Sequence, residues 1–231
     1  MGQMIFSNTL TIDDQTPVGM YETDMSFDHL LLYHELWRAL LNGQSLPRRR
    51  APLPVELIRI ISQQADLVVL DRELTHVHFE GIEVSARDHH VVSKLWFISH
   101  PFDKVKMVHV AGVQLATESH DQGWASHLDQ GSWTWFDMAI IPFPPLQNTT
   151  RDDLAQASLW RKSHHNVVAT MSPRELEGPV VTTDDEMWNN LQNDQLYAIV
   201  IRANARFAGW TNHAKKGELR VWKYFEPIVG L

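Results

Sequence analysis

The chain has 231 residues, of which 44% are hydrophobic and 21% charged, and its formal net charge is −8. This composition is typical of a globular protein with a substantial core. The negative charge argues against nucleic acid or an anionic membrane as the main partner. The lack of cysteine excludes disulfides, thiolate metal sites and cysteine nucleophiles. Residues 1–6 lack the features of a signal peptide, and no apolar run approaches the ~20 residues that span a bilayer, so we expect a cytoplasmic protein.

Two amphipathic helices are predicted in the first third of the chain, after a possible strand at residues 4–12. The first helix begins after Ser26, which is a good N-cap, and stops at Gly43. The second covers residues 54–65 and starts with a proline, which the first helical position tolerates. Both helices carry an apolar stripe at helical spacing, so each is expected to pack against another element.

The rest of the chain is predicted to be mainly β, in a jelly roll or β-sandwich, because short alternating segments recur between turn signals. We expect strands at 91–99, 104–116, 133–141, 166–171, 195–203 and 218–225, the fifth being central because both of its faces are apolar. A capping box at 183–186 predicts a brief helix. Residues 1–74 are expected to pack on a sandwich formed by residues 75–231, so that the whole chain, 1–231, is a single domain.

Three motifs carry a resemblance to a known family. They are Ser-His-Asp-Gln-Gly-Trp at 119–124, Gly-Ser-Trp-Thr-Trp-Phe-Asp at 131–137 and Ala-Arg-Phe-Ala-Gly-Trp-Thr-Asn-His at 205–213. In this order they resemble a family of uncharacterised fungal proteins that look like galactose-binding-domain-like jelly rolls. The chain departs from that family at His120, where arginine is common, and at Ala208, where proline is common.

A fourth segment, 53–58, looks like the opening of an F-box, which implies a protein partner through residues 53–65. The resemblance stops there, because residues 66–80 read as strand and loop and lack the further helices that bind an adaptor.

Candidate site residues come mostly from these motifs. Candidate ligand-binding residues, which supply aromatic walls and cationic donors, are Trp124, Trp133, Trp135, Arg161, Arg206 and Trp210. Candidate catalytic residues, which could move a proton near neutral pH, are His120, Asp121, His164 and His213. An alternative is open for the motif at 121–124: a turn in which Asp121 accepts backbone hydrogen bonds while Trp124 fills the core.

No cofactor and no metal are expected. The chain has no phosphate-binding glycine loop, dinucleotide fingerprint or nucleophile elbow. His76 and His78 share one side of a strand, which Glu80 continues, and such a set could hold zinc, but nothing in the sequence fixes a third ligand. The adjacent pairs at 89–90 and 164–165 are expected to point apart on strands, so that each pair contributes one exposed imidazole and not a metal clamp.

Two interpretations of function follow. The first, favoured by a small margin, is a cofactor-independent enzyme of the cyclase, isomerase or lyase type, such as a pericyclase of fungal secondary metabolism. It would orient an apolar substrate in a pocket lined by tryptophan and histidine. The alternative is a non-enzymatic recognition module, either an F-box-like adaptor or a lectin-like binder of glycan or protein. A lectin would expose aromatic residues on a shallow surface.

Overall fold

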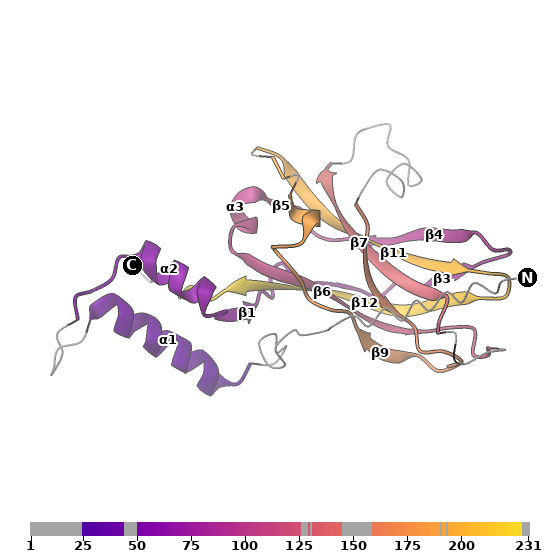
Figure 1. Cartoon of the computed structure of the whole chain (residues 1–231), viewed down its shortest axis with the longest axis horizontal. Coiled ribbons are helices and arrows are strands. Elements are labelled where there is room, and N and C mark those ends of the chain that lie inside the picture. The colour runs from indigo at the N-terminus through magenta and orange to yellow at the C-terminus, as the bar shows by residue number, and fades with distance from the viewer. Residues whose placement is uncertain are drawn as a thin grey trace, which may run out of the picture.

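The computed structural model describes residues 25–43, 50–125, 129, 131–144, 159–189, 191–192 and 194–227. Two antiparallel sheets face each other, and a pair of helices extends from one end of them (Figure 1). This is a β-sandwich of the jelly-roll class with a short helical section, as the sequence predicts. The predicted strand at 4–12 lies outside the described residues.

The first sheet, in the described part of the chain, has seven strands. They are β1 (Val68–Leu70), β2 (His76–His78), β3 (Ile82–Ser85), β6 (Val110–His120), β9 (Arg174–Glu177), β10 (Val181–Thr182) and β12 (Thr211–Tyr224). The two long strands, β6 and β12, pair along most of their length, and β1, β2 and β3 share the other edge of β12. The sheet is therefore organised around one long antiparallel pair.

The second sheet has five strands among the described residues. They are β4 (Val91–Ile98), β5 (Phe102–Asp103), β7 (Thr134–Phe143), β8 (Arg161–His165) and β11 (Leu196–Arg206). β11 pairs with β4 on one edge and with β7 on the other, so the prediction of a central strand here is confirmed. Its burial on both faces follows from this position.

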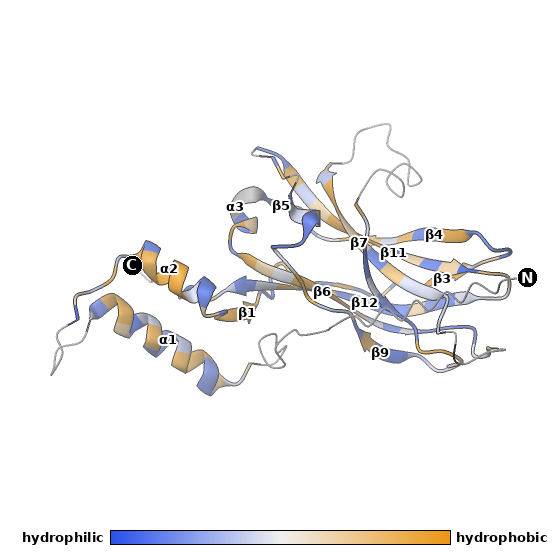
Figure 2. Cartoon of the chain, viewed as in Figure 1, coloured by the Kyte–Doolittle hydropathy of each residue, from blue (hydrophilic) through white to orange (hydrophobic). Residues whose placement is uncertain are grey.

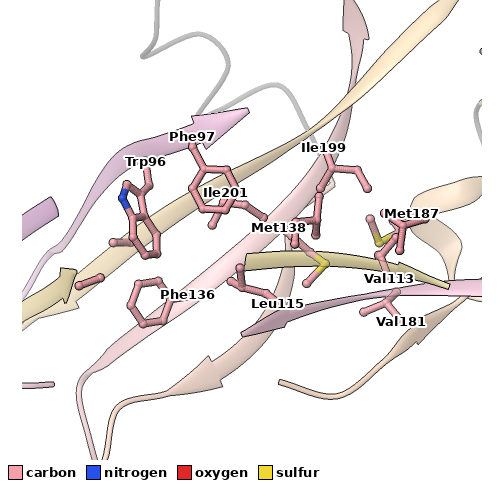
Figure 3. Close-up of a cluster of buried hydrophobic side chains, with 14 of the residues drawn as sticks. Trp96, Phe97, Val113, Leu115, Phe136, Met138, Val181, Met187, Ile199 and Ile201 are labelled. Atoms are coloured by element: carbon pink, nitrogen blue, oxygen red, sulfur yellow. The ribbon is translucent and has the colours of Figure 1, made fainter. Parts of the chain in front are cut away.

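The core lies between the two sheets (Figure 3). β11 and β7 contribute Ile199, Ile201 and Met138 from one side, and β6 contributes Val113 and Leu115 from the other, all of them at most 1% exposed. These residues follow the two-residue period of a strand, so the alternate positions of β6 and β7 face outwards.

The helical section consists of α1 (Phe27–Asn42) and α2 (Val55–Gln64), close to the predicted bounds. The side chain of Ser26 accepts a hydrogen bond from the backbone of His29, as expected of an N-cap. Trp37 and Ile58 pack on Phe225, the residue just after β12. The helix pair extends away from the sheets. Much of α2 consists of hydrophobic residues, which are shown in orange (Figure 2).

Two predicted strands differ from the structure. The prediction at 166–171 is wrong: β8 ends at His165, and the residues after it form a turn whose backbone N–H groups bond to Asp121. The segment at 104–116 begins as a short helix, α3 (Lys104–Met107), before β6. The brief helix is present as η2 (Glu186–Trp188), and Asp185 is its cap.

The two ends of the sandwich differ in character. At one end lie α1 and α2, together with α3 and η2 (Figure 1). At the other, which we call the loop end, residues 86–90, 121–125, 131–133, 166–173 and 207–210 converge (Figure 1). The strand registers require this, since Thr211 pairs with Ser85 and His213 pairs with His120.

Candidate functional site

Most of the predicted site residues lie at the loop end. His120 is the last residue of β6, His213 is near the start of β12, and Arg206 is the last residue of β11. The loops that follow or precede these strands hold Asp121, Trp124, Trp133 and Trp210. Trp135 lies one residue into β7, whereas Arg161 lies at the far end of β8 and pairs with Asp185 at 2.7 Å. The structure thus brings most of the candidates to one end of the sandwich. Arg161 lies elsewhere, His164 points inwards, and Trp135 lies on the outer face of the second sheet beside Lys162 and His165.

His120 and His213 form a stacked pair on neighbouring strands. Their ring centroids are 4.7 Å apart and their planes differ by 15°. The Nδ1 of His120 donates to the carbonyl oxygen of Asp121, and His213 Nδ1 lies 3.7 Å from a carboxylate oxygen of Glu83. Burial and the neighbouring His120 lower the pKa of His213, and Glu83 and Asp121 act in the opposite direction. His213 is therefore held mainly neutral at pH 7.

His164 lies on the inner side of the sandwich and joins the two sheets. Its Nε2 is 2.8 Å from the hydroxyl of Thr117 on β6, and its Nδ1 is 2.8 Å from the hydroxyl of Ser163. Burial, with a contribution from His165, lowers the pKa of His164 to about 4. Thr117 shares the inner face of β6 with Leu115, whereas His120 is on the outer face. The sheet therefore separates His164 from the stacked pair.

Asp121 holds two loops of the loop end together. It is fully buried, and its Oδ1 accepts hydrogen bonds from the backbone N–H groups of Gly123 and Thr170 at 2.8 and 3.0 Å. Its Oδ2 accepts one from Ala169 at 2.7 Å. The interpretation of this motif as a turn is right for Asp121. It is wrong for Trp124, which does not fill the core but is 59% exposed.

Aromatic side chains cover the loop end. Trp133 meets Phe207 edge to face at 4.7 Å between centroids, and the guanidinium of Arg206 lies over both rings, at 5.9 and 4.7 Å. Trp124 lies on the turn at Gly209, close to its backbone. Trp210 is half-buried, and its carbonyl accepts from the backbone of Ala86. The result is a partly exposed aromatic surface with histidine and arginine at its margins.

Sequence reasoning missed a polar cluster on the outer face of the second sheet. Asp137 and Arg202 form a buried ion pair at 2.8 Å, Asn204 donates to the same carboxylate oxygen, and Trp160 stacks on the guanidinium at 4.0 Å. Burial raises the pKa of Asp137, although Arg202 acts against it. The four residues come from three segments, so no local motif could have revealed the cluster.

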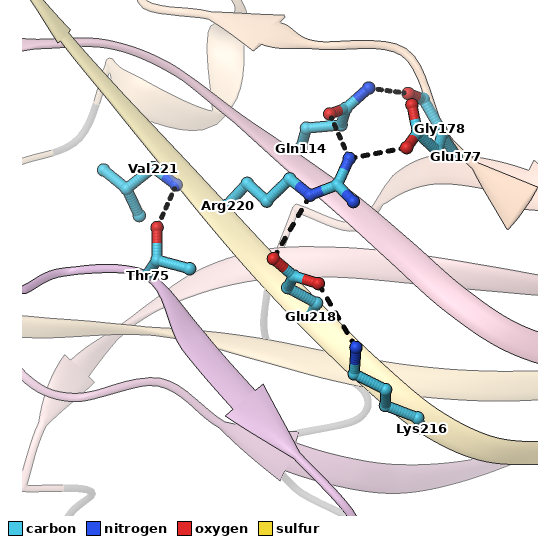
Figure 4. A network of polar contacts seen from close by, with 8 residues as sticks. All are labelled: Thr75, Gln114, Glu177, Gly178, Lys216, Glu218, Arg220 and Val221. Carbon is cyan, nitrogen blue, oxygen red and sulfur yellow. Dashed lines mark hydrogen bonds and ion pairs between the residues drawn. The ribbon is translucent and has the colours of Figure 1, made fainter. Parts of the chain in front are cut away.

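A second missed network lies on the outer face of the first sheet (Figure 4). Arg220 bonds to Glu177 at 2.6 Å, to Glu218 at 3.3 Å and to the side chain of Gln114. These partners stand on three neighbouring strands, so the arginine fastens β9 to the central pair. Its role is structural, because the hollow beside it measures only about 50 Å³.

Larger hollows lie at the helical end of the sandwich. One measures about 390 Å³, and half of the residues that line it are charged, among them Asp71, Lys106 and Lys223. Neighbouring hollows of about 460 and 190 Å³ share Tyr224 with it. None of these three is lined by a tryptophan or by a predicted site residue.

His76 and His78 stand on β2, and the structure adds a neighbour that the sequence could not supply. The ring of His100 lies 4.9 Å from that of His76. Both His76 and His78, however, stack on Phe97, at 5.6 and 5.0 Å. Their rings therefore serve packing in this arrangement.

In the described part of the chain, no helix is long and apolar enough to cross a membrane. No protein-family model matches the sequence, and no curated protein matches it. Two solved structures, of infectious bursal disease virus strains Gt and Gx, show faint likenesses, with 13% and 11% identity and TM-scores of 0.31 and 0.24. The matches cover 67% and 69% of this chain but only 33% and 38% of the viral chains, so this chain spans about a third of their length. At such TM-scores the likeness carries no argument about function. These comparisons give no support to the fungal family or to the F-box-like segment.

Proposed function

We propose that this protein is a recognition module, not an enzyme, and that its loop end binds a saccharide on the indole face of Trp124. The observation that carries the proposal is that Trp124 is 59% exposed yet held in place. Its backbone carbonyl accepts a hydrogen bond from the side-chain amide of Gln122, whose side-chain oxygen accepts one from the backbone N–H of Thr211. The indole ring itself lies against Gly209. An ordered, exposed indole loses little conformational freedom on binding.

The chemistry around this indole suits a sugar. A sugar ring has an apolar face of C–H groups, which packs on the electron-rich face of an indole, and a rim of hydroxyls that need donors and acceptors. The loop end supplies such groups in the stacked His120 and His213 and in the guanidinium of Arg206. Large exposed aromatic residues of this kind are enriched where proteins bind ligands.

The enzyme interpretation stays a prediction, and the geometry favours it less. That interpretation asks for a pocket lined by tryptophan and histidine together. Here His164 is separated from His120 and His213 by the sheet, and the hollows of about 390 and 460 Å³ lie at the opposite end of the sandwich. The exposed Trp124 fits a shallow binding surface better than a closed cavity.

A glycan microarray tests the proposal. The labelled chain is applied to a broad array beside two variants, Trp124→Ala and Phe79→Ala. Phe79 is a matched control because it is also a large exposed aromatic, at 76%, but lies outside the loop end, next to β2. We expect the wild type and Phe79→Ala to bind one class of glycan, and Trp124→Ala to lose it. Failure of the wild type on the whole array, or unchanged binding by Trp124→Ala, would sink the proposal.

A second candidate function is docking of an adaptor protein through residues 53–65. The observation in its favour is that α2 leaves Leu57, Ile60 and Ile61 at 47%, 51% and 36% exposure, so the sandwich does not cover this face. The partner that suits it is a protein with a complementary apolar helix face. A purified F-box adaptor protein is the probe, and size-exclusion chromatography should show a complex that Leu57→Asp abolishes. Separate elution of the two proteins would exclude this function.

A further inference from the structure

A bend at the loop end gathers three metal-ligating side chains. Asp88, His89 and His90 lie between β3 and β4, and all three are exposed. One ligand atom from each, a carboxylate oxygen or an imidazole nitrogen, lies within 4.8 Å of the other two. Among the residues that the structure describes, this group alone meets that spacing with three or more such side chains.

The sequence predicts that adjacent histidines point apart, as they would on a strand. The structure differs because residues 87–90 form a bend, and β4 starts only at Val91. The ring centroids of His89 and His90 are consequently 3.9 Å apart. The expectation that these two side chains point apart, with one imidazole exposed, is therefore wrong, because the rings lie together and both are exposed.

The bend is held by backbone contacts on both sides. The Oδ1 of Asp88 accepts a hydrogen bond from the backbone N–H of His90 at 2.8 Å. The carbonyl of His89 accepts one from the Nε of Arg206 at 3.1 Å. These bonds limit the backbone without using any imidazole nitrogen, so both rings keep nitrogens for a ligand.

We propose that Asp88, His89 and His90 form a surface site for one divalent transition-metal ion, best matched by zinc or copper. Imidazole nitrogen suits these ions, and one carboxylate oxygen makes a set of three protein ligands with open positions for water. Ligand atoms stand about 2 Å from such an ion, so small rotations of exposed side chains bring the present spacing into range. The guanidinium of Arg206, whose Nε donates to the carbonyl of His89, repels a cation at this site and lowers its affinity, while the carboxylate of Asp88 acts in the opposite direction.

This site goes beyond the saccharide proposal and does not depend on it. The two fail separately, because metal binding is measured without any saccharide and the array is run with a chelator present. A positive metal result with a negative array, or the reverse, therefore identifies which proposal is wrong.

Calorimetry with zinc chloride and copper chloride tests the site, on the full chain without a histidine tag. We expect one ion per chain, and a loss of at least about tenfold in affinity for His89→Ala and for His90→Ala. His29→Ala is the matched control, since His29 is an exposed histidine on α1, and it should bind like the wild type. No saturable binding, or equal affinity in the His89→Ala/His90→Ala double variant, would overturn the proposal.

A second measurement needs no variant. Copper added to the ¹⁵N-labelled wild type should broaden the amide signals of residues 87–91 before any others, and electron paramagnetic resonance should show two nitrogen ligands. Broadening that starts around His76 or around His120 would contradict the assignment.

Discussion

The indole ring of Trp124 lies against Gly209: a Cβ atom built on this glycine would stand 3.4 Å from both Cη2 and Cζ2 of the ring. Gly209 also has a φ of +89°, which favours glycine. One residue thus permits the turn and provides the surface on which the indole rests.

We expect Gly209→Ala to lower the free energy of unfolding by about 1 kcal/mol, because alanine is strained at positive φ. It should also disturb the environment of Trp124. Gly131→Ala is the matched control: its φ is +77°, but nothing lies within 4 Å of the built Cβ. Urea unfolding should give similar costs for the two variants, while the Trp124 indole NMR signal moves only in Gly209→Ala. If that signal also moves in Gly131→Ala, its movement does not report the contact between Trp124 and Gly209.

Asp121 is expected to act as a positioning residue for the loop end. In Asp121→Asn the amide group cannot accept at both oxygen positions, so one of the three buried N–H groups it now satisfies loses its partner. The expected cost is about 1–3 kcal/mol in urea unfolding, with weaker saccharide binding. Asp184→Asn, at an exposed position, serves as the control. A variant as stable as the wild type would mean that these hydrogen bonds contribute little.

His164 should make stability fall in mild acid. Its folded pKa of about 4 lies below the ordinary value near 6.5, so the unfolded chain binds the proton more tightly. Stability from this group is full above about pH 6.5 and is lost as the pH falls towards 4. Between pH 7 and pH 5 the loss is about 2 kcal/mol. Urea unfolding of the wild type and His164→Gln at both values measures it, and the variant should lack this part of the pH dependence. An NMR titration of His164 with a midpoint near 6.5 would contradict the account.

The buried pair of Asp137 and Arg202 gives a prediction about stability alone. Arg202→Met leaves the buried carboxylate without its countercharge, and we expect a cost of about 3–5 kcal/mol. In the Asp137→Leu/Arg202→Met double variant no charge is stranded, so the total cost should be well below the sum of the single costs. Additive costs in thermal or urea unfolding would show that the two side chains do not interact in solution.

Much of the fold could be predicted because its signals are local. The Ser26 cap and the apolar periodicity define α1, and the apolar residues on both faces of 195–203 define a central strand. The strand predicted at 166–171 failed because Asp121, some 48 residues away, takes the backbone N–H groups that a strand would need. A contact that distant in sequence leaves no mark on the local pattern.

The site was predictable in part for a similar reason. Turn motifs such as those at 121–124 and 207–210 mark the ends of strands. Because neighbouring strands are antiparallel, every second connection along the chain lies at the same end of the sandwich, so the loop end could be anticipated. Whether a side chain at such an end faces in or out depends on register and burial. That is why the exposure of Trp124 and the inward position of His164 became visible only in the structure.

The most direct test of the central claim is an NMR titration of the tryptophan indole N–H signals with the saccharide class found on the array. The chain has nine tryptophans, and Trp124→Phe assigns the signal in question. We predict that the Trp124 signal shifts in a saturable manner, while that of the buried Trp222 stays in place. A saccharide that binds but leaves the Trp124 signal unmoved would contradict the account.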